Sequence, residues 1–517
     1  MKNSEKIKFI ALFLILALLI PLIVTITSCA NNSAEETGNN DNNPNNQNNN
    51  NEEIKNTEDD ITEETTEAEV KILPDLPEKN FGGYEFKIIT SDYIKDPNMP
   101  REIGAEEETG DPINDAIYKR NKKIEEQYDV TIKEILHERD SLNVPVKKAV
   151  MAADGSYDLI CGNIRELGIL SLAGSLLDLA KVTYLDLDKP WYDQKAAGDL
   201  SIGHRLFFGI GELQISNKDG TWVVLFNKKL LQNLSIEDPY QLVKENKWTM
   251  DKFFEMATAA NKDINGDGKM DEDDQWGILG EGFDIYALMN GAGTRLVQKD
   301  ENDLPFYAGY TSRDIDIFEK GAEYLGDKNK AMLADNYVSK YSNVWTELIN
   351  PIFATDRILF FFTSLSRVTW HRNFETDFGI LPTPKYEESQ TNYVNTVSVW
   401  MASGFGLPAN LSGEELDRNA IITEALTAES LYTLTPAYYD IQLKNKLTRD
   451  DESAEMLDII FANRTYSTIH LYDWGGLITT IQSQLTANNR NFVSSLDKIE
   501  NRIIKDIDKT ISAYEDK

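Results

Sequence analysis

The sequence predicts an α/β fold with mainly parallel strand pairing and more than one domain. Short apolar runs rich in β-branched residues alternate with amphipathic helical segments, and this alternation is typical of parallel strands joined by crossover helices. The chain has 517 residues, too many for a single hydrophobic core, so two or more domains are expected.

The N-terminus has the pattern of a bacterial lipoprotein signal. Three lysines in the first eight residues precede the apolar run Phe9–Ile26. The run ends in Ile26-Thr27-Ser28-Cys29, which resembles the lipobox, and the resemblance implies removal of residues 1–28 and lipid attachment to Cys29. An uncleaved membrane anchor is the alternative, but Pro21 and the abrupt polar switch after the cysteine do not suit a spanning helix.

Residues 29–80 are expected to be a disordered acidic tether. From Asn31 to about Glu69 the chain is rich in Asn, Glu, Asp and Thr and almost free of large apolar side chains. Low hydropathy with excess negative charge leaves little to offset the entropy lost on ordering. The folded body is therefore expected to begin near Phe81.

The first part of the body alternates strands and helices. We expect strands at 84–89, 130–132 and 157–162, and helices at 114–126, 144–153 and 167–179. Cys161 lies in the third apolar run and is expected to be a buried small residue. Arg205–Glu212 contains two glycines that could absorb hinge rotation, so it is the expected crossover between lobes.

The second part opens with Trp222–Phe226, a continuous apolar run that predicts a buried strand. Thr249 is placed to cap the next helix, and Asp251 suits its positive end. Further helices are expected at 285–290, 315–325, 331–341, 364–373, 416–431 and 453–462, and strands at 357–362, 378–384 and 394–401. Apolar residues from Phe492 to Ile511 recur every three or four positions, which predicts a long surface helix.

The segment from Asp263 to Asp274 has the spacing of a calcium-binding loop. Oxygen donors occupy its positions 1, 3, 5, 7, 9 and 12, and Gly268 at position 6 permits the sharp turn. The expected ligands of a structural Ca²⁺ are Asp263, Asn265, Asp267, Lys269 through its carbonyl, Asp271 and Asp274. The alternative is a solvated acidic turn.

The net charge excludes several partners. Lysine and arginine number 52 against 86 acidic residues, a net charge of −34, so nucleic acid and anionic lipid headgroups are not expected as partners. With only two cysteines, one of them the expected lipid site, no disulfide is expected.

Together with the lipobox and the tether, several segments of the body resemble the maltose-binding-like solute-binding lipoproteins of ABC importers (extracellular solute-binding protein family 1). They are Pro190-Trp-Tyr192, Leu225-Phe-Asn-Lys228, Trp248-Thr-Met-Asp251, the stretch 263–277, Phe378-Gly-Ile-Leu-Pro-Thr-Pro384, Pro436-Ala-Tyr-Tyr439 and Trp474-Gly-Gly476.

The resemblance implies a periplasmic-binding-protein-like fold of type II, with two lobes joined by hinge crossovers and a sugar or oligosaccharide held between them. The expected boundaries are 81–206 and 387–445 for lobe 1, and 207–386 and 446–517 for lobe 2. It also implies a monomer without enzymatic activity, lipid-anchored to the outer face of the bacterial cytoplasmic membrane, that delivers its ligand to an ABC permease.

The resemblance further assigns ligand-binding positions. They are Asp92, Arg165, Glu166, Glu212, Phe283, Trp370 and Trp474. Aromatic rings in this family stack on sugars, and charged groups bond their hydroxyls. Trp222, Trp248 and Trp276 are expected to be core residues.

Other functions remain open at the level of sequence. A lipid-anchored glycoside hydrolase needs two suitably spaced carboxylates, and no such pair can be assigned from sequence. The motifs G-x-S-x-G and H-E-x-x-H are absent, and the four histidines are scattered. A ligand-sensing or adhesive surface lipoprotein is the third possibility. Peptides, nucleosides and anions are alternative ligands.

Overall fold

The structure is a computed structural model that describes residues 71–92, 101–371, 377–438 and 451–515. The expected signal sequence, the expected lipid site Cys29 and the expected tether up to residue 70 lie outside these residues. No helix within the described ranges combines the length and apolar character needed to cross a membrane.

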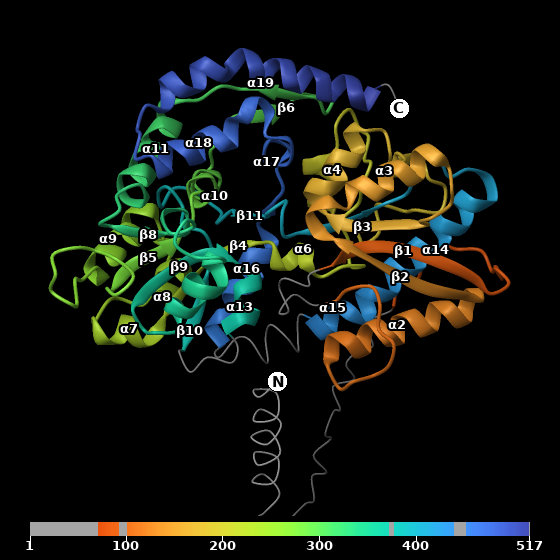
Figure 1. The fold of residues 1–517 in the computed structure, drawn as a ribbon, viewed down its shortest axis with the longest axis horizontal. Helices are drawn as coiled ribbons and strands as arrows, with labels where there is room; N and C mark the ends of the chain where they lie inside the picture. Colours follow the sequence, from red (N-terminus) through yellow and green to blue (C-terminus); the bar gives the residue numbers. More distant parts are fainter. Residues whose placement is uncertain (1–70, 93–100, 372–376, 439–450, 516–517) are drawn as a thin grey trace, which may run out of the picture. The chain divides into compact units, whose positions relative to one another are not determined.

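Lobe 1 contains a four-stranded sheet in the order β12-β3-β1-β2 (Figure 1). Strands β1 (Tyr84–Asp92), β2 (Val130–Glu138) and β3 (Leu159–Asn163) are parallel, and β12 (Ser403–Gly406) lies antiparallel to β3. The three strands expected from the first part of the body are therefore confirmed, although β2 extends well past its expected end. Cys161 lies fully buried in the centre of β3.

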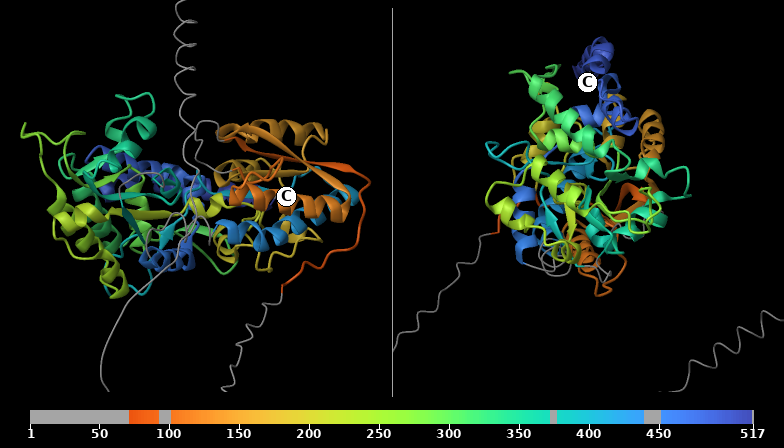
Figure 2. Two further views of the ribbon diagram at one scale, coloured as in Figure 1. Left: turned by 90° about the horizontal axis from the view of Figure 1, so that it is seen from below. Right: turned by 90° about the vertical axis from the view of Figure 1, so that its left-hand side faces the viewer.

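Helices on both faces cover this sheet (Figures 1 and 2). They are α2 (Pro112–Tyr128), α3 (Asn143–Ala152), α4 (Ile164–Leu172), α5 (Gln194–Leu200), α14 (Gly413–Tyr432) and the short α15 (Leu434–Pro436), with 3₁₀ turns η1 (Arg139–Ser141) and η2 (Leu179–Lys181). The side chain of Asp111 caps α2 and Pro112 begins it. The expected helix 167–179 is wrong beyond Leu172, because Ser175 N bonds to Leu170 O and closes the helix there.

Lobe 2 contains a five-stranded sheet in the order β10-β4-β9-β5-β8. The strands are β4 (Trp222–Asn227), β5 (Trp276–Gly280), β8 (Ala331–Leu333), β9 (Ile358–Ser364) and β10 (Phe378–Leu381). β5 pairs in parallel with β8 and β9, whereas β4 is antiparallel to both β9 and β10. In this described sheet β10, β9, β5 and β8 therefore run in one direction and β4 is reversed, so the expectation of a mainly parallel sheet is met in both lobes.

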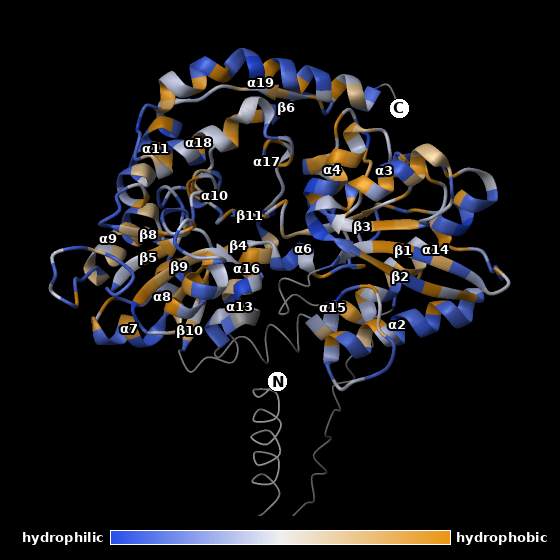
Figure 3. Ribbon diagram, viewed as in Figure 1, coloured by the Kyte–Doolittle hydropathy of each residue, from blue (hydrophilic) through white to orange (hydrophobic). Residues whose placement is uncertain are grey.

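The helices of lobe 2 pack around this sheet, whose strands are mostly apolar (Figure 3). They are α7 (Lys228–Asn233), α8 (Pro239–Lys244), α9 (Met250–Ala260), α10 (Asp284–Gly291), α11 (Ser312–Leu325), α12 (Asn350–Phe353), α13 (Ser366–His371), α16 (Asp451–Ala462), α17 (Thr468–Tyr472) and α18 (Leu477–Thr486), with the π-helical turn η4 (Trp345–Ile349), the 3₁₀ turns η3 (Ala334–Asn336) and η6 (Trp474–Gly476), and the hairpin β6 (Val297–Lys299) and β7 (Pro305–Tyr307). Thr249 caps α9 as expected. The expected helix 331–341 is wrong, because its first residues form the edge strand β8.

Three segments run side by side between the lobes in the described part of the chain. The segments are Gly220–Trp222, β11 (Asn395–Thr396) with the two residues after it, and β13 (Arg464–Thr465). Val397 links them, because it forms a bridge with Thr221 and its N–H donates to Thr465 O at 3.0 Å. These segments form the hinge.

The expected crossover at Arg205–Glu212 is wrong. Gly209 exchanges two backbone hydrogen bonds with Phe405 of β12, so this segment belongs to lobe 1. A Cβ on Gly209 would lie 2.6 Å from the Phe405 ring, and one on Gly211 would lie 2.5 Å from the Trp191 carbonyl oxygen. These glycines therefore permit close packing within lobe 1 and do not act as hinge points.

Helix α19 (Phe492–Glu515) contacts both lobes. Near its start Phe492 stacks on Phe318 of α11 with ring centroids 4.6 Å apart. Near its end Tyr514 meets Phe207 of lobe 1 edge to face at 4.8 Å. The apolar stripe expected from the sequence is confirmed, because its members Phe492, Leu496, Ile503 and Ile507 are buried. Apolar and polar residues alternate along the ribbon of this helix (Figure 3).

Candidate ligand-binding cleft

A cavity of about 720 Å³ lies between the two sheets, and we call it the cleft. Its lining residues come from both lobes and from the hinge. They are Asp92, Glu138, Arg139, Asp140, Trp222, Glu281, Phe283, Asn343, Trp345, Thr346, Thr363, Ser364, Arg367, Ser398, Trp400, Met401, His470 and Gln482. This volume lies within the range of about 300–1,000 Å³ typical of small-molecule sites.

The strand ends of both sheets position the polar part of this lining. Asp92 and Glu138 are the last residues of β1 and β2, Glu281 directly follows β5, and Ser364 ends β9. Ligands of α/β sheets bind outside the carboxyl ends of strands, where loops are free to carry polar groups. The two sheets therefore present their functional edges to one shared space.

Aromatic rings supply the apolar part of the lining. Trp222 meets Phe283 edge to face at 4.9 Å, and both side chains come from lobe 2. Trp345 on η4 is partly exposed. Trp400, on the turn between β11 and β12, is 43% exposed, which is unusual for so large an apolar side chain. The rings can cover the flat apolar faces of a ligand.

Charged groups on the lobe 1 side include a planar ion pair. Arg139 Nε and Nη2 donate to the two carboxylate oxygens of Asp140 at 2.8 and 3.0 Å. Asp92 and Glu138 add two further carboxylates on this side. Such groups are suited to bond several hydroxyls at once.

On the lobe 2 side, a turn held by two carboxylates presents Glu281. Asp284 Oδ2 accepts the Glu281 N–H at 2.7 Å, and Asp335 Oδ2 accepts the Gly282 N–H at 2.6 Å. Burial and the nearby Asp335 charge raise the pKa of Glu281 to about 7, although Arg367 opposes the shift. Burial, followed by the Glu281 charge, raises the pKa of Asp284 well above its usual range. Glu281 can thus donate or accept a hydrogen bond near neutral pH.

His470 of α17 connects the cleft to the hinge. Its ring stacks on Phe283 with centroids 4.5 Å apart. Burial lowers the pKa of His470 to about 3, although a hydrogen bond to the Val397 backbone opposes the shift, so the ring is neutral at neutral pH. His470 and its hinge contact carried no signal in the sequence.

Two of the expected ligand residues lie in the lining. The structure places Asp92 and Phe283 in the cleft, and their contact with a ligand stays a prediction. Trp370 lies on α13, which also carries the cleft residue Arg367, but its side chain is outside the described part of the structure. Trp222 is buried as expected but also lines the cleft, whereas Trp248 and Trp276 are confirmed as core residues.

Arg165 and Glu166 lie behind the cleft and are not part of its lining. Glu166 is fully buried and accepts hydrogen bonds from the backbone and side chain of Asn143. The Arg165 guanidinium stacks over Trp400, 4.2 Å from the ring centroid. The assignment of Glu166 to direct ligand contact is therefore wrong, because its carboxylate is satisfied within lobe 1.

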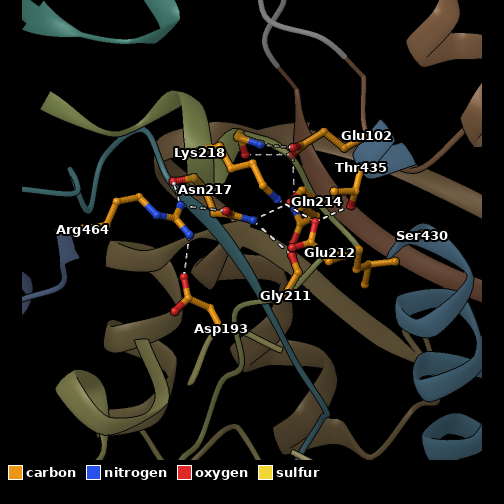
Figure 4. A network of polar contacts seen from close by, with 12 residues as sticks. Glu102, Asp193, Gly211, Glu212, Gln214, Asn217, Lys218, Ser430, Thr435 and Arg464 are labelled. Atoms are coloured by element: carbon orange, nitrogen blue, oxygen red, sulfur yellow. Dashed lines mark hydrogen bonds and ion pairs between the residues drawn. The ribbon is translucent and has the colours of Figure 1, made fainter. Parts of the chain in front are cut away.

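Glu212 belongs to a buried polar network beside the hinge (Figure 4). It pairs with Lys218 at 2.6 Å and accepts the Thr435 hydroxyl. Burial is the largest single influence and raises the pKa of Glu212, but the Lys218 charge, the hydrogen bonds from Lys218 and Thr435 and the Arg464 charge together outweigh it, so the net shift is downward. In the same network Arg464 of the hinge strand β13 pairs with Asp193 of lobe 1 at 2.7 Å. Glu212 is not among the residues that line the cleft, because Lys218 and Thr435 hold its carboxylate in this network, and its contact with a ligand stays a prediction.

Trp474 is a core residue. Its side chain is 2% exposed, stacks on Tyr472 at 5.5 Å, and donates its indole N–H to Thr510 of α19 at 2.8 Å. The expectation that it stacks on a sugar is wrong, because neighbouring side chains already occupy its surface.

The loop 263–274 has donor atoms of the kind that calcium prefers. Asp263 accepts the N–H groups of Gly266 and Gly268 at 2.6 and 2.8 Å, and Gly268 adopts a φ of 80°. Asp274 is fully buried and accepts the N–H groups of Ile264 and Asp271, both at 3.0 Å. Among the residues described, however, no three His, Cys, Asp or Glu side chains gather closely enough to hold a metal ion. Calcium binding stays a prediction.

Searches with protein-family models and among curated proteins found no match to this sequence. Among solved structures, the fold is similar to an ABC substrate-binding protein of Listeria monocytogenes in complex with cycloalternan (TM-score 0.51, 11% identity, 84% of this chain and 98% of the other). It is also similar to a cyclo/maltodextrin-binding protein complexed with maltotetraose (0.52, 13%, 84% and 97%). A third match is a cyclic α-maltosyl-1,6-maltose binding protein of Arthrobacter globiformis (0.54, 12%, 82% and 99%).

At these identities the likeness establishes the fold. The chain has the two-lobed architecture of maltose-binding-like solute-binding proteins, as the sequence resemblance implied.

Proposed function

We propose that this chain is the solute-binding component of an ABC importer and that it captures a neutral oligosaccharide in the cleft. The observation that carries the proposal is the composition of the lining, in which tryptophans and carboxylates from both lobes face one cavity. Rings that cover the apolar face of a pyranose, with charged groups that bond its hydroxyls, make a typical saccharide site. The ligands named for the three similar structures are all oligosaccharides, which supports this substrate class.

The mechanism is closure of two lobes on the ligand. Asp92 and Trp400 belong to the lobe 1 side, whereas Glu281 and Trp345 belong to lobe 2, so one bound molecule contacts both. A ligand that makes more contacts in the closed form shifts the equilibrium by the difference between its affinities for the two forms. The hinge segments around Val397 carry the rotation.

The cellular setting is part of the proposal. Lipid attachment at Cys29 holds the monomer at the outer face of the cytoplasmic membrane. The acidic tether lets the folded body move away from the membrane surface. The closed form docks on an ABC permease. Ca²⁺ bound in the loop 263–274 stabilises that part of lobe 2.

Isothermal titration calorimetry tests this proposal with maltotriose, maltotetraose, cycloalternan and D-mannitol, alongside a galacturonate oligomer as an anionic control. We expect one neutral saccharide to bind with 1:1 stoichiometry and the anionic oligomer to fail. Chromatography of the sugar after incubation separates binding from hydrolysis, because a glycoside hydrolase would return cleaved products. Failure of every saccharide would contradict the proposal and favour a sensing or adhesive role with another ligand.

A further inference from the structure

Trp400 exposes much of its ring to the cleft, yet one side of the ring is already covered. The guanidinium of Arg165 lies 4.2 Å from its centroid, the geometry of a cation–π stack. An exposed tryptophan on a turn has freedom about two side-chain torsions, and stacking on one side restricts that freedom.

The guanidinium is itself held in place. Arg165 Nη1 pairs with Glu166 at 3.1 Å, and Glu166 is fully buried. The Glu166 carboxylate accepts hydrogen bonds from Asn143, and the Glu166 N–H donates to Asn163 Oδ1 at 2.9 Å, so the residue is fixed at the start of α4. A rigid partner lowers the entropy that Arg165 loses in forming the stack.

The backbone ties the two residues together as well. Arg165 N–H donates to Val399 O at 3.0 Å, and Ile164 N–H donates to Ala402 O at 2.9 Å. The turn that carries Trp400 is therefore attached to the start of α4, and its ring moves with lobe 1.

We propose that Arg165, held by Glu166, is a positioning residue that fixes the Trp400 ring with a single face open to the ligand. The inference rests on the proposed function, because it assigns Trp400 to a ligand platform. Arg165 does not line the cleft, so it acts through the ring and not by direct contact. Removing the stack is expected to weaken saccharide binding by roughly two- to five-fold, the range of a partly exposed cation–π pair.

The first test needs no ligand. The full chain is labelled with 5-fluorotryptophan, and the ¹⁹F resonance of Trp400 is identified by its loss in Trp400→Phe. We expect Arg165→Gln to shift and broaden that resonance, and Arg165→Lys to do so too, since lysine keeps the charge without the planar stack. An unchanged resonance in both variants would overturn the proposal.

Arg418 provides a matched control. Its guanidinium stacks 3.7 Å over Tyr84 and lies 3.6 Å from Asp158, a similar arrangement in lobe 1 away from the cleft. Arg418→Gln should leave the Trp400 resonance unchanged. If it alters that resonance as much as Arg165→Gln does, the effect is general to lobe 1 and the proposal fails.

The second test is a double-mutant cycle with maltotetraose as the probe. We expect Arg165→Gln to lower affinity in the wild-type background and to have no effect in Trp400→Ala. An equal loss in both backgrounds would show that Arg165 contacts the ligand itself. If no saccharide binds, the proposed function fails, and the ¹⁹F resonance still decides whether Arg165 positions the ring.

Discussion

The indole N–H of Trp222 donates a 2.8 Å hydrogen bond to Oδ1 of Asp284, a carboxylate with no solvent exposure. The other oxygen of Asp284 accepts the N–H of Glu281. One buried acid thus fixes both an aromatic ring and a carboxylate of the cleft. The arrangement places two carboxyl groups with raised pKa values close together on the lobe 2 side, which has measurable consequences.

Glu281→Gln is expected to stabilise the ligand-free protein at high pH. Burial and the nearby Asp335 charge raise the pKa of Glu281 from its usual value of 4.5 to about 7, so the folded state holds a proton that the unfolded state releases between these values. Folding stability contributed by this group is therefore present at low pH and lost as pH rises through about 7. The variant should gain about 1–2 kcal/mol at pH 8 and nothing at pH 4. Urea unfolding at both pH values measures the free energy of unfolding. An equal gain in that free energy at pH 8 and pH 4 would contradict the raised pKa of Glu281.

Trp345→Ala and Trp400→Ala are each expected to weaken saccharide binding about 5- to 30-fold, because a stacked ring contributes on the order of 1–2 kcal/mol. Their melting temperatures should change little, since both rings are partly exposed. Calorimetric titration and thermal unfolding measure the two effects separately. If both variants bind the saccharide with wild-type affinity, these two rings do not contact the ligand.

Trp474→Ala is expected to act on stability instead. The ring is enclosed against Tyr472 and its N–H is bonded to Thr510, so truncation leaves a cavity and removes this buried hydrogen bond. A cost of about 3–5 kcal/mol in the free energy of unfolding is expected. Chemical denaturation measures it, and a near-normal stability with abolished sugar binding would restore the sequence-based interpretation.

Calcium is expected to raise the melting temperature, and a chelator to lower it. Asp263→Asn should abolish the calcium-dependent shift, because position 1 supplies a charged ligand. Asp273→Asn is the matched control, since Asp273 is an exposed acid of the same loop outside the predicted ligand set. Identical melting curves with calcium and with chelator would leave the loop as a solvated acidic turn.

The sequence was sufficient to predict elements whose apolar pattern is continuous. β4 and β9 are uninterrupted apolar runs buried on both faces, and the stripe of α19 spans its whole length, so local pattern and tertiary role agree. The prediction of a helix at 331–341 was wrong because the few apolar residues of this segment fit a helix as well as a short edge strand.

The ligand site was harder to predict because it depends on which way a ring points. Trp474 and Trp400 are the same residue type, yet one is enclosed and the other is open. Trp400 was hidden in a segment expected to be a strand, and it lies on a turn. Glu138 was missed because β2 continues beyond Ile132, so the residue at its carboxyl end was not recognised.

The buried position of Cys161 makes it possible to label introduced cysteines selectively. It is the free thiol of the described residues, it has no exposure, and burial raises its pKa well above the usual range, so the thiolate that reacts with maleimides is scarce. A cysteine introduced on the surface of each lobe would be labelled in preference to it. Energy transfer between two such dyes could then report how far apart the lobes stand in single molecules, with the native strand left intact.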